Sequence, residues 1–300
     1  MNTAIAFIGL GNMGAPMATN LVSAGYSVTG FDLSEPALEA ARQGGVTIAD
    51  SAAKAVAEAS VVITMLPSGK HVLDAYGEDD GLLAAAPANT LFIDSSTISV
   101  DDARAAAQQA RDAGHRAIDA PVSGGVVGAS AGTLTFMVGG TNADAAEADQ
   151  VLQPMAGRVV HCGDAGAGQA AKVCNNLMLA VSTIGVSEAF VLGEKLGLTN
   201  EALYDVASSA SGQCWSLTTN CPVPGPVPGS PANRDYKPGF AGALMNKDLG
   251  LAMDAVESTG TEAQIGSLTA AIYRKFAENG GAELDFSGII THIRDDSEGK

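Results

Sequence analysis

The stretch "IAFIGLGNMGAPMATNL" (residues 5–21) decides the fold, because it joins an apolar run to a cluster of glycines and then to a helical pattern. Gly9, Gly11 and Gly14 have the spacing G-x-G-x-x-G. In a dinucleotide-binding turn the first glycine permits the turn, the second lets backbone approach a pyrophosphate, and the third lets helix pack on strand. Glycine is common in this chain, with 36 in 300 residues, so the spacing needs support from its context.

That context supports a dinucleotide site. The motif predicts an acidic residue about 20 positions on, at the end of the second strand, to bind the adenosine ribose. Asp32, which closes "SVTGFD" (27–32), is that residue, and no arginine follows it at 33–35 to pair with a 2′-phosphate. The pattern therefore favours NAD over NADP. Asn12 and Met13, inside the turn, are expected to approach the bound cofactor at the helix N-terminus.

The chain divides into two regions of different character. Up to about residue 160, short apolar strands alternate with alanine-rich helical stretches, which predicts an α/β, Rossmann-type doubly wound and mostly parallel sheet covered on both faces. After residue 168 the patterns are helical, apart from a proline- and glycine-rich loop at 221–239. We predict a dinucleotide-binding domain at 1–164 and an all-α domain at 165–300, with a long connecting helix from about residue 168.

Composition excludes several classes of function. The net charge of −17 repels polyphosphate backbones, which argues against a nucleic-acid partner. The four cysteines form no CxxC pair and the four histidines no HExxH, so no metal site is predicted. The N-terminus lacks a basic segment before its apolar run, and the apolar stretch 175–198 is interrupted by polar residues. We therefore expect a cytoplasmic protein with no membrane partner.

Two further loops follow predicted strands, at the end of the sheet where ligands of such folds bind. They are "MLPSG" (65–69) and "DSSTIS" (94–99). Leu66, Pro67 and Thr97 are thus candidates for cofactor contact. Ordinary turn residues are the alternative interpretation.

Three segments carry residues suited to the chemistry. In "DAPVSGG" (119–125), Ser123, Gly124 and Gly125 can bind a carboxylate through backbone amides and a hydroxyl, although a flexible lead-in to a hairpin has the same composition. In "GAGQAAKVCNN" (166–176), Lys172 and Asn176 lie four apart on one helical face.

A lysine at the start of an apolar helix would have its ammonium disfavoured by desolvation, which suits a proton carrier. A surface lysine is the alternative to that role for Lys172. In "GALMNKDLGLA" (242–252), Lys247 and Asp248 are adjacent on a helix built for packing, where an ordinary salt bridge would explain the pair equally well.

In order and spacing these segments resemble the four signature segments of the β-hydroxyacid dehydrogenases, and the similarity spans nearly the whole chain. The resemblance implies that the helical domain binds substrate and builds the subunit interface of a homodimer or homotetramer. It implies that Lys172 is the catalytic lysine and that Lys247 touches the nicotinamide side of NAD. It also implies a substrate-binding set that holds the carboxylate or the reacting oxygen, namely Ser123, Gly124, Gly125 and Asn176.

Segments 211–240 and 284–290 resemble the branch of that family that oxidises 3-hydroxyisobutyrate in valine breakdown. The resemblance implies a small anionic hydroxy acid as substrate, with hydride passing to nicotinamide and Lys172 as general acid and base. The chain departs from its relatives after Asn220, where Cys-Pro-Val-Pro lacks a bulky aromatic. Reduction of tartronate or succinic semialdehyde is an alternative, and a catalytically silent NAD-binding interaction module is another.

Overall fold

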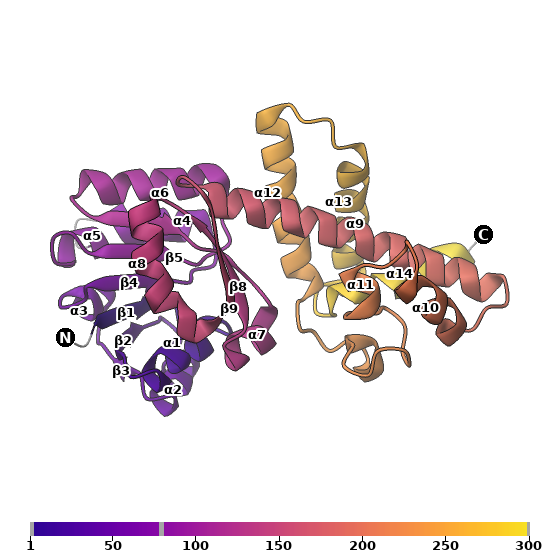
Figure 1. Ribbon diagram of the computed structural model, residues 1–300, viewed down its shortest axis with the longest axis horizontal. Coiled ribbons are helices and arrows are strands. Elements are labelled where there is room, and N and C mark those ends of the chain that lie inside the picture. The colour runs from indigo at the N-terminus through magenta and orange to yellow at the C-terminus, as the bar shows by residue number, and fades with distance from the viewer. Residues whose placement is uncertain (1–2, 78–80, 299–300) are drawn as a thin grey trace. The chain divides into compact units, whose positions relative to one another are not determined.

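The computed structural model describes residues 3–77 and 81–298 (Figure 1). The chain forms two compact units, one up to Lys172 and one from Val173. This division lies within helix α9 (Ala167–Lys195), which contributes residues to both units. The boundary expected at 164–165 precedes this helix and stays a prediction.

The described residues of the first unit form one sheet of nine strands in the order β3-β2-β1-β4-β5-β6-β8-β7, with β9 beside β8. Neighbours from β3 to β6 pair in parallel, β8 is antiparallel to β6 and β7, and β9 is parallel to β8. The strands are β1 (Ala4–Ile8), β2 (Ser27–Phe31), β3 (Thr47–Ile48), β4 (Val61–Thr64), β5 (Leu91–Asp94), β6 (Arg116–Asp119), β7 (Val122–Ser123), β8 (Leu134–Gly139) and β9 (Ala156–Gly163). The expected mostly parallel sheet is confirmed. Strands β3 and β7 were missed because two residues are too few to show a periodicity.

Helices cover both faces of this sheet (Figure 1). One face packs against α1 (Gly14–Ser23), α2 (Glu35–Gln43), α7 (Gly125–Ala131) and α8 (Asn142–Leu152). The other packs against α3 (Ala52–Val56), α4 (Gly69–Gly77), α5 (Leu82–Ala85) and α6 (Val100–Asp112). Strands β4 and β5 are buried along their whole length, as parallel strands between two helical layers must be.

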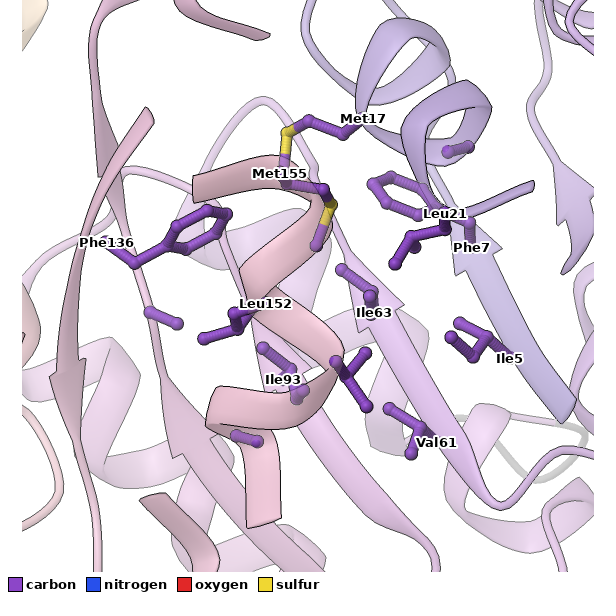
Figure 2. Packing of buried hydrophobic residues seen from close by; sticks show 14 of the residues in the cluster. Ile5, Phe7, Met17, Leu21, Val61, Ile63, Ile93, Phe136, Leu152 and Met155 are labelled. Atoms are coloured by element: carbon purple, nitrogen blue, oxygen red, sulfur yellow. The ribbon is translucent and has the colours of Figure 1, made fainter. Parts of the chain in front are cut away.

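Figure 2 shows the core on the α1 side of the sheet, where Met17 and Leu21 of α1 lie near Phe7 of β1. Leu152 of α8 and Met155, in the 3-10 turn η1 (Gln153–Met155), complete this core. Burial of these large side chains is what holds the glycine turn between β1 and α1 in place, because both of its flanking elements are anchored.

The second unit is helical. Its described residues form no strand, although Ala241 and Asp285 make a single antiparallel bridge. Its helices are the later part of α9, then α10 (Asn200–Ser209), α11 (Trp215–Thr218), α12 (Gly242–Thr259), α13 (Gln264–Phe276) and α14 (Ile289–Glu298), with short turns η2 (Pro231–Arg234), η3 (Ala277–Gly281) and η4 (Phe286–Gly288). Apolar residues of α9, α12, α13 and α14 form its main core. The expected helical region is confirmed.

The proline-rich loop is held by a buried carboxylate at its end and by hydrogen bonds within it. Asp285 accepts backbone N–H bonds from Gly239 at 2.9 Å and Phe240 at 3.1 Å, and the Asn220 amide donates to it at 3.3 Å. The hydroxyl of Tyr236 donates to the Pro222 carbonyl at 2.8 Å. Polar contacts within the loop, together with those to Asp285, therefore replace the ladder that a proline-rich loop cannot form.

By length and composition alone, α9 is apolar enough to cross a membrane. Within the protein, 44% of its most apolar window is buried, and core helices of soluble proteins pass the same test. Its buried hydroxyls are bonded to the helix itself, Thr183 to the Leu179 carbonyl at 2.8 Å and Ser187 to the Thr183 carbonyl at 2.7 Å. The pattern is therefore weak evidence for a membrane span.

Candidate active site

The three glycines of the first turn differ in what surrounds them. Gly9 has φ +94°, and a Cβ there would lie 2.2 Å from the Met65 carbonyl oxygen. A Cβ on Gly14 would lie 1.9 Å from the Gly9 carbonyl oxygen. Gly11 has nothing within 4 Å of such an atom. The protein itself therefore requires glycine at 9 and 14, whereas the open space at Gly11 fits a ligand that approaches the backbone.

The start of α1 suits an anion. Met13 occupies the N-cap position without a side-chain hydrogen bond, and the first turn holds no acidic residue. Gly11 and Asn12 are exposed and Met13 is half-buried. A helix N-terminus presents N–H groups that its own turns do not use, and its dipole favours negative charge. These features fit the pyrophosphate of a dinucleotide.

Asp32 makes two backbone contacts that the sequence did not predict. One carboxylate oxygen accepts the Leu10 N–H at 2.7 Å and the other accepts the Ser34 N–H at 2.8 Å. Asp32 therefore ties the glycine turn to the end of β2. A carboxylate has about four acceptor positions, so each oxygen retains one for a ribose hydroxyl. The residue that follows, Leu33, is 93% exposed.

The two loops expected to contact the cofactor are joined to each other. The Leu66 N–H donates to the Ser96 hydroxyl at 2.8 Å, and that hydroxyl donates to Asp94 at 2.6 Å. Leu66 and Thr97 are half-buried and Pro67 is exposed. Because β1, β4 and β5 are parallel neighbours, these loops and the glycine turn lie at the same edge of the sheet.

Lys172 lies in the first turns of α9 and is 7% exposed, so the alternative of a surface lysine is wrong. Its Nζ donates to the carbonyl oxygen of Val122 at 2.9 Å. Val122 directly precedes Ser123, and the next two residues have positive φ, +132° at Gly124 and +60° at Gly125. The fold therefore brings the lysine to the predicted carboxylate-binding corner, across 50 positions of sequence.

Asn176 follows Lys172 by one helical turn and is 2% exposed. Its side-chain amide donates to Asp248 at 2.6 Å, and Asp248 on α12 is buried too. Lys247, on the same helix, is half-buried. The sequence placed Asp248 beside Lys247 without assigning it a role, and its contact with Asn176 was missed.

Comparison with known protein families gives two matches. Residues 4–163 match the family model described as the NAD binding domain of 6-phosphogluconate dehydrogenase. Residues 166–293 match the model described as NAD-binding of NADP-dependent 3-hydroxyisobutyrate dehydrogenase.

Full-length relatives are also found. A probable 3-hydroxyisobutyrate dehydrogenase of Mycobacterium tuberculosis is 61% identical over 97% of this chain and 98% of its own. An NAD-dependent L-serine dehydrogenase of Pseudomonas aeruginosa is 46% identical over 99% of each chain. The solved structure of a Mycobacterium tuberculosis 3-hydroxyisobutyrate dehydrogenase with L-serine superposes with a TM-score of 0.94, at 60% identity, over 98% of this chain and 100% of that chain.

The chain belongs to the β-hydroxyacid dehydrogenases. It is therefore an oxidoreductase that acts on a hydroxy acid with a nicotinamide dinucleotide as cofactor. Among its described residues, no group of three or more histidine, cysteine or acidic side chains is arranged to hold a metal ion. Its four cysteines, Cys162, Cys174, Cys214 and Cys221, are free.

In this dehydrogenase the start of α9 is held by a residue that sequence reasoning missed. Asp119, at the end of β6, accepts the N–H of Gly166 at 2.7 Å and that of Gln169 at 2.9 Å. Burial raises the pKa of Asp119, and these backbone hydrogen bonds oppose the rise. In the sequence, Asp119 could have been recognised as a candidate because it is an aspartate at the end of an apolar strand.

Asp94, at the end of β5, is the second buried carboxyl of this edge. Burial raises its pKa to about 6, against hydrogen bonds from Ser96 and Thr64. One oxygen takes those bonds, and Oδ2 has no hydrogen-bond partner among the described residues. A small cavity is lined by Tyr76, Asp94 and residues of α6 and β6, Asp119 among them. Asp94 thus holds the loop after β5, and Asp119 holds the start of α9.

Proposed function

We propose that this dehydrogenase oxidises 3-hydroxyisobutyrate to methylmalonate semialdehyde with NAD, a step of valine breakdown. The observation that carries the proposal is the buried Lys172, whose Nζ is held 2.9 Å from the carbonyl that precedes the Ser123–Gly125 corner. The name of the 61% identical relative supports the choice of substrate.

The residues present fit NAD. The glycine turn and the start of α1 would hold the pyrophosphate, and Asp32 would bind the adenosine ribose. The loops after β4 and β5 would contact the cofactor through Leu66, Pro67 and Thr97. Lys247 is proposed to contact the nicotinamide side. When bound, the cofactor accepts the hydride of the carbinol carbon.

The chain's own residues must then place the substrate and move one proton. Ser123 and the amides of Gly124 and Gly125 are proposed to bind the substrate carboxylate. Lys172 takes the hydroxyl proton during oxidation, and in reduction its ammonium returns that proton. The Val122 carbonyl directs Nζ by accepting one of its N–H bonds. Asn176, oriented by Asp248, holds the reacting oxygen.

L-serine is a second candidate substrate. A relative at 46% identity is named an NAD-dependent L-serine dehydrogenase, and the superposed structure contains L-serine. Serine shares the carboxylate and primary alcohol of 3-hydroxyisobutyrate but carries an ammonium in place of a methyl group. A site that takes serine must offer that ammonium a hydrogen-bond acceptor or a negative charge.

A substrate panel decides between these functions. We would compare kcat/KM for oxidation of 3-hydroxyisobutyrate and L-serine and for reduction of tartronate and succinic semialdehydes, each with the NAD and the NADP form of the cofactor. The proposal expects 3-hydroxyisobutyrate with NAD to exceed every other combination at least tenfold. A higher value for L-serine would replace it, and a folded, NADH-binding protein inactive on the whole panel would favour the silent binding module.

We also propose a cytoplasmic homodimer or homotetramer. Large apolar side chains of the second unit are exposed in the single chain, which is the composition of a surface that associates. They include Met178 at 66%, Leu192 at 59% and Leu196 at 72% on or beside α9. Light scattering coupled to size exclusion measures the mass directly, and a mass of about 30 kDa would contradict the proposal.

A further inference from the structure

The loop that carries Thr97 is attached to the helix that carries Lys172 by one buried side chain. The Gln169 amide donates to the Ser96 carbonyl at 2.7 Å, and its oxygen accepts the Ile98 N–H at 3.3 Å. Gln169 is 0% exposed. Both backbone groups that flank Thr97 are therefore held by the same carboxamide, across more than 70 positions of sequence.

The backbone of Gln169 is fixed as well. Its N–H donates to the Asp119 carboxylate at 2.9 Å, in the first turn of α9. A Cβ on the preceding Gly168 would lie 2.3 Å from the Met137 carbonyl oxygen, so the start of the helix is packed directly on β8. Gln169 thus has little freedom to move with respect to the sheet.

Gln169 also shares a helical face with the catalytic lysine. Lys172 follows it by three positions and Asn176 by seven, which is the spacing of one helical stripe. On the loop side, the Ser96 hydroxyl accepts the Leu66 N–H at 2.8 Å. A chain of polar contacts, half-buried at Leu66 and buried beyond it, therefore runs from the loop after β4, through the loop after β5, to the first turns of α9.

We propose that Gln169 is a positioning residue that sets the distance between Lys172 and the loop that carries Thr97, and so between Lys172 and the cofactor that this loop is proposed to contact. The inference rests on the proposed role of Lys172 as proton carrier. Hydride and proton transfer require the reacting atoms within a few tenths of an ångström of their productive places, and a displacement of about 1 Å lowers the rate by about 100-fold. Gln169 touches neither substrate nor reacting atoms, and it acts through the two elements that do.

Gln169→Met tests the inference, because methionine has a similar length and volume but neither hydrogen-bonding group. We expect kcat per NADH-binding site to fall at least tenfold, with the Kd for NADH changed less than threefold, since the pyrophosphate and adenosine contacts lie elsewhere. We expect the primary deuterium isotope effect on kcat to stay at or above the wild-type value, because the chemical step is the one impaired. Gln108→Met, a surface change on α6, is the matched control and should leave all three quantities unchanged.

Amide hydrogen exchange provides a readout that needs no substrate. Peptides covering residues 95–99 should exchange at least fivefold faster in Gln169→Met, while those covering β1 and β2 keep their wild-type rates. Gln169→Glu retains an acceptor for Ile98 but, when ionised, places a carboxylate oxygen against the Ser96 carbonyl. Peptides covering residues 95–99 should therefore exchange faster than wild type in this variant too, and it provides the readout if Gln169→Met does not fold.

A kcat within twofold of wild type, or faster exchange spread equally over the whole first unit, would overturn the proposal. Lys172→Ala is measured in parallel. Retained turnover in that variant would refute the proposed role of Lys172, whereas the exchange rates of residues 95–99 would still decide whether Gln169 holds the loop.

Discussion

Because the Asp94 carboxyl is buried, we expect the free energy of unfolding of the first unit to fall as the pH rises. Burial is the largest cause of the rise of its pKa from 3.8 to about 6. Because one pKa unit corresponds to ~1.4 kcal/mol, ionising this carboxyl in the folded protein costs about 3 kcal/mol. The folded state binds the proton more tightly than the unfolded state. The stabilisation that the protonated Asp94 carboxyl contributes is therefore complete below about pH 4 and is lost as the pH rises through about 6.

Asp94→Asn removes the ionisation and keeps an oxygen that can accept the hydrogen bonds of Thr64 and Ser96. Relative to this variant, the wild-type free energy of unfolding should fall by about 3 kcal/mol between pH 4 and pH 8. Asp119, whose pKa is also raised, remains in both proteins, so its direct effect cancels in the comparison.

The assay must report on the first unit, and the single tryptophan, Trp215, lies in the second. We would therefore equilibrate both proteins in urea at each pH, apply a brief deuterium pulse at one fixed pH, and follow peptides that cover β4 and β5 by mass spectrometry. The reasoning would be refuted if the free energies of unfolding of wild type and Asp94→Asn changed equally from pH 4 to pH 8. It would also be refuted if the wild type became more stable relative to the variant as the pH rose.

Three further predictions follow from the site. Lys172→Ala should lower kcat/KM at least 100-fold with the Kd for NADH changed less than threefold, and steady-state kinetics with substantial turnover would contradict its role. Gly14→Ala should lower the free energy of unfolding of the first unit, measured in urea, by about 2 kcal/mol, because the new Cβ meets the Gly9 carbonyl. Gly11→Ala should leave that free energy nearly unchanged, because its Cβ meets no protein atom, but should weaken NADH binding at least tenfold in a titration. Leu33→Arg places a cation at a 93% exposed position beside Asp32, where it can pair with a 2′-phosphate, so it should raise kcat/KM with NADP at least fivefold without a change in stability. An unchanged ratio of kcat/KM with NADP to kcat/KM with NAD would show that the 2′-phosphate lies elsewhere.

Much of the fold was predictable because its signals are local. The alternation of buried apolar strands with alanine-rich helices identified the doubly wound sheet, and the loss of strand patterns after residue 168 identified the helical region. The two-residue strands β3 and β7 were not predictable, because their pairing depends on neighbours distant in the chain. Likewise, the pattern could not reveal that the proline-rich loop is held by Asp285.

The sequence by itself indicated the family, the doubly wound fold and the candidate site residues, because the glycine turn, Asp32 and the segment around Lys172 are short patterns of backbone conformation and residue type. Only the tertiary structure decided how they are held. Lys172 bonds to Val122 across 50 positions and Asn176 to Asp248 across 72. A buried polar group must find a partner, and in a folded chain that partner comes from whichever element packs against it, so its identity is a property of the packing and not of the neighbouring sequence.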